Sequence, residues 1–323
     1  MPGRRTIGVD MGGTKLLAGA VDADYLVHRR LQRSVGGLDQ SALLESAVQA
    51  VQELREPADG EIDAVGFGIP SLIDRRSGRS VVAVHLPLAG VPLADVMAER
   101  LGLPVFVDND ANLALLAEHR AGAAQGARHA LMITVGTGIG GGLVLDGELY
   151  RGAVGAAGEL GHITIDLDGP PCHGNCPSRG CLEALASGTA LAREARRLAE
   201  ERPDSGLAAA LADGRPLGGA LVTELAHDGD PAAREAIERI GTHLGIGIAS
   251  LLNIFNPEVV VIGGGVIGAG ELLLAPARAQ AERRALPPSR EARIVPAHFG
   301  AEAGMVGAAV LAREGVGVAG AGR

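Results

Sequence analysis

The stretch TIGVDMGGTKLLAGAV, residues 6–21, decides the fold that this sequence predicts. A short β-branched run breaks at Gly12 and Gly13, and a second apolar run follows at once. We therefore predict a strand, a glycine turn and a second strand. Residues 131–145, LMITVGTGIGGGLVL, repeat the pattern. Since two glycine turns in matching contexts rarely arise by chance, we interpret the pair as an internal duplication with two similar sheets.

Both turns are suited to binding phosphate. Glycine lets backbone N–H groups approach an anion closely, while Thr14 offers a hydroxyl and Lys15 a cation. Lys15 is the only lysine among 29 basic residues, which hints at a need for a compact point charge there. The spacing is not that of a Walker A loop, and a strand rather than a helix follows. With Asp10 before the turn, a phosphate site is favoured over an ordinary hairpin, and we expect one polyphosphate to lie between the two turns.

A second polar segment follows the strand predicted at residues 104–107. Asp108, Asn109 and Asp110 come in succession, and a helical pattern begins at residue 111. The ordinary role of Asp110 in that place is to cap the helix. However, α/β folds bind ligands at the carboxyl ends of strands, so this segment is a candidate site.

The three cysteines of the chain lie close together in a loop rich in glycine and proline. Cysteines that were merely small buried hydrophobes would be scattered over strands and helices. Such a loop cannot hold its shape by burying apolar surface, so a metal is the plausible organiser. One histidine and three cysteines at spacings of ten, four and five can close a tetrahedral structural zinc site, with the ligands His162, Cys172, Cys176 and Cys181.

These segments together resemble the ROK family (repressors, open reading frames and sugar kinases). The matching segments occur in family order over nearly the whole chain: DMGGTK at 10–15, DND-AN at 108–112, GELGH at 158–162, GCLE at 180–183, NPE and GGG within 256–265, and AGMVGAA at 303–309. The resemblance implies an α/β, actin-like (ASKHA or ribonuclease H-like) fold with the active-site cleft between two domains. We expect a small domain at 1–112, with a C-terminal helix at about 304–323 packing back on it. The large domain is expected at 113–303, with the zinc loop at 162–181.

The resemblance also implies an activity, the ATP-dependent phosphorylation of D-glucose to glucose 6-phosphate, and a role for each matching residue. Asp110 would be the general base, Asp10 would hold Mg²⁺ through water, and Asp108 would be structural. The implied sugar ligands are Asn109, Asp110, Glu159, His162, Glu183 and His85. The implied ATP and phosphate ligands are Asp10, Gly12, Gly13, Thr14, Lys15, Gly136, Thr137, Gly138, Gly264 and Gly265.

Three departures leave alternatives open. His85 stands at or next to the place where the family has a sugar-binding asparagine, so N-acetylmannosamine, fructose or mannose could be the substrate. Three residues separate Cys172 from Cys176 where the family has one, which makes His173 a spare ligand. Polyphosphate could replace ATP as donor. A sugar-sensing regulator without a DNA-binding domain is the remaining alternative, because only nine residues precede Asp10 and none form a basic recognition helix.

The amino-acid composition excludes some classes of binding partner. The net charge of −9 argues against nucleic acid and anionic membranes. Only two tyrosines, four phenylalanines and no tryptophan are present, so a sugar would be held by hydrogen bonds rather than by stacking. The longest apolar run, residues 259–270, is short of the roughly 20 residues that span a bilayer. We expect a soluble cytoplasmic protein with reduced thiols, and from the family a homodimer or homotetramer.

Overall fold

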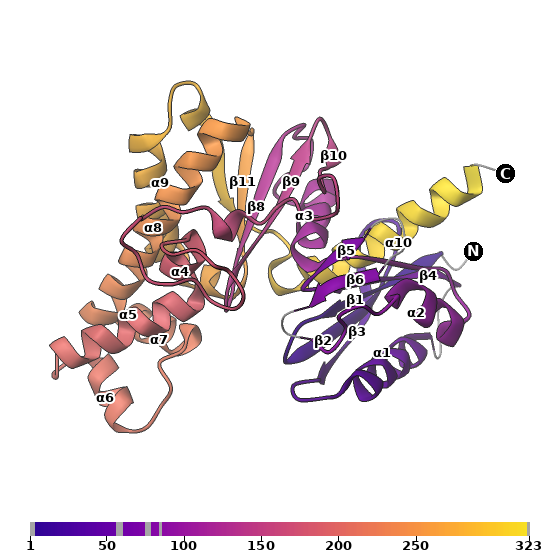
Figure 1. Ribbon diagram of the computed structural model, residues 1–323, viewed down its shortest axis with the longest axis horizontal. Helices are drawn as coiled ribbons and strands as arrows, with labels where there is room; N and C mark the ends of the chain where they lie inside the picture. Colours follow the sequence, from indigo (N-terminus) through magenta and orange to yellow (C-terminus); the bar gives the residue numbers. More distant parts are fainter. Residues whose placement is uncertain (1–3, 56–60, 75–78, 84–85, 322–323) are drawn as a thin grey trace. The chain divides into compact units, whose positions relative to one another are not determined.

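The computed structural model describes residues 4–55, 61–74, 79–83 and 86–321, without the side chains of Val82 and of residues 318–321. The chain forms two compact units, each built on one five-stranded sheet (Figure 1). Unit 1 consists of Met1–Gly126, Leu149–Gly158 and His298–Arg323. Unit 2 consists of Ala127–Glu148 and Glu159–Ala297.

The sheet of unit 1 has the strand order β3-β2-β1-β4-β7. Strand β1 runs antiparallel to β2 and parallel to β4, and β4 runs parallel to β7. The strands are β1 (Arg5–Met11), β2 (Lys15–Val21), β3 (Val27–Ser34), β4 (Ile62–Ile69) and β7 (Val105–Asn109), with β5 (Ser71–Asp74) and β6 (Arg79–Ala83) as a separate ribbon. The helices are α1 (Gln40–Arg55), α2 (Leu93–Leu101), α3 (Asp110–Ala121) and α10 (Ala303–Ala321), with the short 3-10 helix η4 (Gly300–Glu302) before α10.

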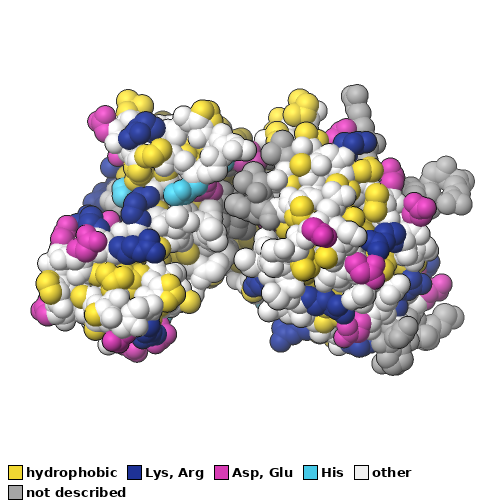
Figure 2. All heavy atoms as spheres, turned by 60° about the horizontal axis from the view of Figure 1, so that its bottom comes forward, with side chains coloured by type: hydrophobic (Ala, Val, Ile, Leu, Met, Phe, Trp, Pro, Cys, Tyr) yellow, Lys and Arg dark blue, Asp and Glu magenta, His cyan; other side chains and the backbone are white. Residues whose placement is uncertain are grey.

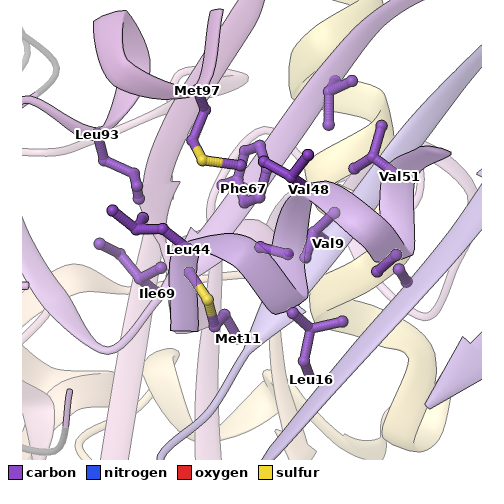
Figure 3. Close-up of a cluster of buried hydrophobic side chains, with 14 of the residues drawn as sticks. Val9, Met11, Leu16, Leu44, Val48, Val51, Phe67, Ile69, Leu93 and Met97 are labelled. Atoms are coloured by element: carbon purple, nitrogen blue, oxygen red, sulfur yellow. The ribbon is translucent and has the colours of Figure 1, made fainter. Parts of the chain in front are cut away.

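Two apolar clusters hold the sheet of unit 1. One is formed by the strands with α1 and α2, where Val48, Phe67 and Met97 point toward one another (Figure 3). The other is formed by α3 and α10. Helix α10 lies directly on the sheet because Gly8 and Gly66 carry no side chain: a Cβ at either position would overlap a backbone carbonyl oxygen of α10.

A buried carboxylate fixes the chain that leads into α10. Glu118 of α3 is fully buried and accepts hydrogen bonds from the backbone N–H groups of Ala123 (2.8 Å), His298 (3.0 Å) and Phe299 (2.8 Å). Three N–H donors satisfy a carboxylate that would otherwise be costly to bury. The C-terminal segment is thereby held on α3.

The sheet of unit 2 repeats that of unit 1. Its order is β10-β9-β8-β11-β12, with β8 antiparallel to β9 and parallel to β11, and β11 parallel to β12. The strands are β8 (Ala130–Val135), β9 (Ile139–Leu145), β10 (Glu148–Leu149), β11 (Val259–Gly263) and β12 (Arg293–Pro296). The helices are α4 (Leu182–Ala186), α5 (Gly188–Glu201), α6 (Gly206–Ala212), α7 (Gly219–His227), α8 (Pro231–Phe255) and α9 (Glu271–Arg284), with 3-10 helices η1 (Leu160–His162), η2 (Gly265–Ala269) and η3 (Ser289–Glu291). This matching order is what an internal duplication predicts.

Two features differ from the pattern in the sequence. Residues 182–201 have a helical pattern in the sequence but form two helices, because Ser187 leaves helical geometry and its hydroxyl caps α5 by accepting from Ala190 N (3.2 Å). Helix α3 and the segment Leu149–Gly158 group with unit 1, whereas we expected the first domain to end at residue 112. The reason for α3 is its apolar packing against α10.

The surface carries charges of both signs. Acidic and basic side chains are interspersed over the visible face of each unit (Figure 2). Among the described residues, no helix is both long enough and apolar enough to cross a membrane.

Candidate active site

The glycine turn of unit 1 joins β1 to β2 and is held by backbone hydrogen bonds. Gly12 N donates to Lys15 O (2.9 Å), and Thr14 O accepts from Val35 N (3.0 Å) and Gly36 N (3.2 Å). The side chains of Thr14 and Lys15 are exposed. The turn is therefore rigid in its backbone and presents a hydroxyl and an ammonium group to a ligand.

Two carboxylates lie next to this turn. The pKa of Asp10 is raised to about 7, mainly by burial and also by the nearby charge of Asp110, while Lys15 opposes both. Asp10 also lies against the first turn of α10, since a Cβ on Gly304 would be 2.7 Å from its Oδ2. Asp10, Lys15 and Asp110 are thus electrostatically coupled within unit 1.

Asp110 is the first residue of α3, directly after β7. The role of N-cap falls on Asn109, whose Oδ1 accepts from Ala111 N (3.0 Å) and Asn112 N (3.1 Å). Asn109 Nδ2 lies 3.5 Å from the carbonyl of Ser71. The capping role that Asp110 would ordinarily have is therefore taken by its neighbour, and the charge of Asp110 is near enough to Asp10 to raise the pKa of that carboxyl group.

Asp108 forms the buried part of this segment, in line with its expected structural role. Its Oδ2 accepts from Arg151 Nε at 2.6 Å, and its Oδ1 accepts from Asn109 N (2.8 Å) and Asn112 Nδ2 (3.4 Å). No pattern in the sequence pointed to Arg151, because 43 positions separate it from Asp108.

The glycine turn of unit 2 joins β8 to β9 and is held by the start of α5. Gly136 O accepts from Gly188 N (2.7 Å), and Thr137 O accepts from the hydroxyl of Thr189 (2.8 Å). Gly136 N donates to Gly138 O within the turn (2.9 Å). Gly188 and Thr189 were not among the site residues predicted from the sequence.

Two further predicted residues adjoin this second turn. Glu183 Oε2 accepts from Ile139 N (2.7 Å), and a Cβ on Gly138 would overlap that carboxylate. Gly264 lies between β11 and η2 at φ +85°, and a Cβ there would overlap the backbone of Val135, directly before the turn. Gly265 follows as the first residue of η2.

The four predicted zinc ligands come together in unit 2. One ligand atom each from His162, Cys172, Cys176 and Cys181 lies within 4.8 Å of the others, and His173 is not part of the group. The Sγ atoms of Cys176 and Cys181 are 3.8 Å apart, and Cys172 Sγ is 3.6 Å from His162 Nδ1. Tetrahedral zinc, at ~2.3 Å from sulfur and ~2.0–2.1 Å from nitrogen, requires about 3.8 Å and about 3.6 Å for such pairs. The donor set and its spacing therefore fit zinc.

The electrostatics of this group also favour a cation. Burial raises the pKa of the Cys172 thiol to about 12 and raises that of Cys181 as well, whereas the backbone N–H of Ser178 lowers the pKa of Cys176. Thiolates crowded together need a positive charge to offset their repulsion. With Nδ1 facing the cysteines, His162 Nε2 lies 3.7 Å from Glu159 Oε2. Such a carboxylate partner commonly orients a metal-binding histidine.

The predicted site residues thus fall into two groups. Unit 1 holds Asp10, Gly12, Gly13, Thr14, Lys15, Asn109 and Asp110. Unit 2 holds Gly136, Thr137, Gly138, Glu159, His162, Glu183, Gly264, Gly265 and the three cysteines. His85, the predicted sugar ligand in place of an asparagine, lies outside the described residues.

Comparison with known proteins adds relatives along almost the whole chain. The sequence model of the ROK family matches residues 6–315. A glucokinase of Streptomyces coelicolor is 37% identical over 314 residues, which are 96% of this chain and 98% of the relative. A xylose repressor of Caldicellulosiruptor bescii is 36% identical over 65% of this chain and 52% of its own.

A solved structure matches the fold equally well. The ROK family glucokinase of Streptomyces griseus, determined in complex with glucose and AMPPNP, superposes with a TM-score of 0.87 and 36% identity. The match covers 96% of this chain and 99% of the other. The chain therefore has the two-domain actin-like fold that the family resemblance implied.

Proposed function

The chain belongs to the ROK family, and from that premise we propose that it is a glucokinase, which transfers the γ-phosphoryl group of ATP to D-glucose and forms glucose 6-phosphate. Its glucokinase relatives cover nearly its full length. Within the chain, the observation that carries the proposal is that Asp10 and Lys15 stand on either side of the first glycine turn and that the charge of Asp110 acts on Asp10. A base, a cation and a phosphate-binding turn are the groups that a sugar kinase requires.

The chemistry needs alignment and charge stabilisation more than covalent help, because phosphoryl transfer passes through a loose transition state. Asp110 accepts the proton of the sugar hydroxyl as the bond from that oxygen to phosphorus forms and the bond to ADP breaks. Base catalysis of this kind contributes about 10²–10⁴-fold. Lys15 and the backbone N–H groups of Gly13 and Gly138 stabilise the phosphate charge, whereas the N–H groups of Gly12 and Gly136 hold the turns themselves.

We assign Mg²⁺ to Asp10, with water in between. A bound Mg²⁺ would neutralise phosphate charge during transfer. Asp10 suits the role because its own carboxylate is costly to ionise where it lies, so a cation compensates it. Gly264 and Gly265 are assigned to the nucleotide side of the site.

Sugar binding is assigned to Asn109, Asp110, Glu159, His162 and Glu183. All are hydrogen-bonding residues, which agrees with the scarcity of aromatic side chains. The preference for glucose over other hexoses rests on the relatives, since His85 is outside the described residues.

We propose zinc for the group of His162, Cys172, Cys176 and Cys181. Four protein ligands leave zinc no open position, so the site is structural rather than catalytic. Its role would be to fix the loop that carries His162 and Glu183. We further propose that the protein acts in the cytoplasm, in glycolysis, as a homodimer or homotetramer.

The test is coupled ADP release with glucose, mannose, fructose and N-acetylmannosamine, each with ATP and with polyphosphate. We expect the highest kcat/KM for glucose with ATP. A higher kcat/KM for another hexose, or with polyphosphate as donor, would mean that this compound and not glucose or ATP is the substrate. Sugar binding in calorimetry without any ADP release would instead favour a sugar-sensing regulator, as the xylose repressor among the relatives suggests.

A further inference from the structure

We propose that Arg151 is a positioning residue for the sugar: its buried ion pair with Asp108 fixes the turn of Asn109 and Asp110 to the segment Leu149–Gly158. The inference rests on the proposed function, because it assigns Arg151 to the same site. Arg151 matches none of the residues to which the family resemblance gives a role.

The ion pair is short and shielded from solvent. Arg151 Nε lies 2.6 Å from Asp108 Oδ2, and the two side chains are only 14% and 7% exposed. A charge-assisted hydrogen bond in such surroundings is little weakened by water or salt. The pair is also costly to break from one side, since the remaining charge would stay buried without a partner.

Asp108 connects Arg151 to the reacting groups. While Oδ2 binds Arg151, Oδ1 accepts from the backbone N–H of Asn109 (2.8 Å) and from the side chain of Asn112 (3.4 Å). That N–H belongs to the residue directly before Asp110. A shift of the Asp108 carboxylate therefore moves the peptide that sets the direction of the proposed base.

Arg151 also organises the segment from which it comes. Its guanidinium donates to the carbonyl of Leu149 (3.3 Å), and its own carbonyl accepts from Ala157 N (3.1 Å). Gly155 packs so closely on the β5–β6 ribbon that a Cβ there would overlap the carbonyl oxygen of Ile73. The segment is therefore seated in unit 1, and the next residue of the chain is Glu159.

These contacts connect Arg151 to two residues that are assigned to sugar binding. Asn109 is reached through Asp108, and Glu159 follows the segment that Arg151 holds. Displacement of reacting groups by about 1 Å can cost roughly 10²-fold in rate. Loss of the ion pair should therefore weaken the binding and alignment of the sugar more than it weakens the binding of the nucleotide.

The experiment measures kcat and the KM values for glucose and ATP in Arg151→Gln, Arg151→Lys and the double variant Arg151→Gln/Asp108→Asn. The matched control is Arg120→Gln, which removes another pair of 2.6 Å in unit 1, with Glu314, at the far end of α3 from Asp110. For Arg151→Gln we expect kcat/KM for glucose to fall about 10–10²-fold, with a raised glucose KM and a nearly unchanged ATP KM.

The other variants separate positioning from simple support of the fold. Arg151→Lys should recover part of the lost kcat/KM for glucose, because lysine restores the positive charge. The double variant should have a higher kcat/KM for glucose than Arg151→Gln, because no buried carboxylate is left without a partner. An unchanged glucose KM in Arg151→Gln and Arg151→Lys, with only lower melting temperatures as in Arg120→Gln, would overturn the inference. If the wild type phosphorylated no hexose, the proposed function would fail, and glucose affinities of the same variants by calorimetry would then decide for or against Arg151.

Discussion

The two glycine hairpins of this protein share a topology and differ in chemistry. In unit 1 the turn between β1 and β2 lies between Asp10 and Lys15, and the charges of Lys15 and Asp110 both act on Asp10. In unit 2 the turn between β8 and β9 has no charged residue of its own, and the start of α5 and the carboxylate of Glu183 hold its backbone. Duplication supplied the same scaffold twice, and Lys15 and the proposed base Asp110 are on one copy.

The difference teaches that a turn can be suited to phosphate in two ways. The first turn brings charges from its own strands, whereas the second depends on residues far along the chain to orient its backbone. We therefore expect mutations at the first turn to change chemistry and pH dependence, and mutations at the second to change binding and stability.

The largest effect is expected at Asp110. Asp110→Asn should lower kcat by about 10²–10⁴-fold, since the amide cannot accept the proton of the sugar hydroxyl. Steady-state kinetics measure the loss, and calorimetry with glucose should show retained binding. Glu183→Gln in unit 2 is the comparison, and it should act mainly on glucose KM. Near-normal turnover in Asp110→Asn would contradict the assignment of Asp110 as the general base.

Asp10→Asn should uncouple stability from pH. The pKa of Asp10 is about 7 in the folded protein and 3.8 ordinarily, so the folded state binds the proton more tightly. The stabilisation from this proton is complete below pH 3.8 and is lost as the pH rises through about 7. Asparagine does not titrate, so in EDTA the variant should gain about 2–3 kcal/mol more, relative to wild type, at pH 8 than at pH 5.

Thermal melts at the two pH values measure this gain, and the variant should also lose Mg²⁺-dependent turnover. An equal difference between variant and wild type at both pH values would contradict the raised pKa of Asp10 in the folded protein.

A pair of alanine substitutions sharpens the comparison at the second turn. A Cβ at Gly138 overlaps Glu183, whereas one at Gly136 meets no atom within 4 Å. Gly138→Ala should therefore cost about 1–3 kcal/mol of stability and raise the glucose KM. Gly136→Ala should leave the melting temperature unchanged and raise the ATP KM, because a methyl group keeps phosphate from the backbone. Identical profiles for the two variants would show that Glu183 does not hold this turn.

Cys176→Ser should act on the proposed zinc loop and, through Glu183, on the second turn. We expect loss of zinc and about 2 kcal/mol or more of stability, because a missing ligand opens the loop. Cys172 Sγ is 3.8 Å from Glu183 Oε1, so a smaller rise in glucose KM should follow. Metal analysis and thermal melts measure both effects, with His173→Ala as the control that keeps its zinc. Full zinc content in Cys176→Ser would argue against this ligand set.

The sequence was informative wherever neighbours along the chain decide the structure. The two hairpins, the strand and helix on either side of Asp108–Asp110 and the grouping of His162 with the three cysteines followed from local patterns, and the structure has all of them. The family resemblance was confirmed by the match over residues 6–315.

Contacts between distant residues were not predictable. Arg151 binds Asp108, Glu118 binds His298 and Phe299, and Gly188 binds the second turn, and none of these pairs leaves a spacing to recognise. The N-cap at Asn109 was missed for a different reason. Aspartate and asparagine cap helices equally well, so composition alone could not choose between adjacent candidates.

The close packing of α10 on Gly8 and Gly66 affects how the protein is made. Strand β1 needs helix α10, far along the chain, to cover it, whereas unit 2 comes entirely from residues between these two elements. During synthesis, unit 2 can fold while the sheet of unit 1 still has one apolar face uncovered. Unit 1 is therefore complete only once α10 has been made, and a chain that lacked α10 would expose that face to aggregation.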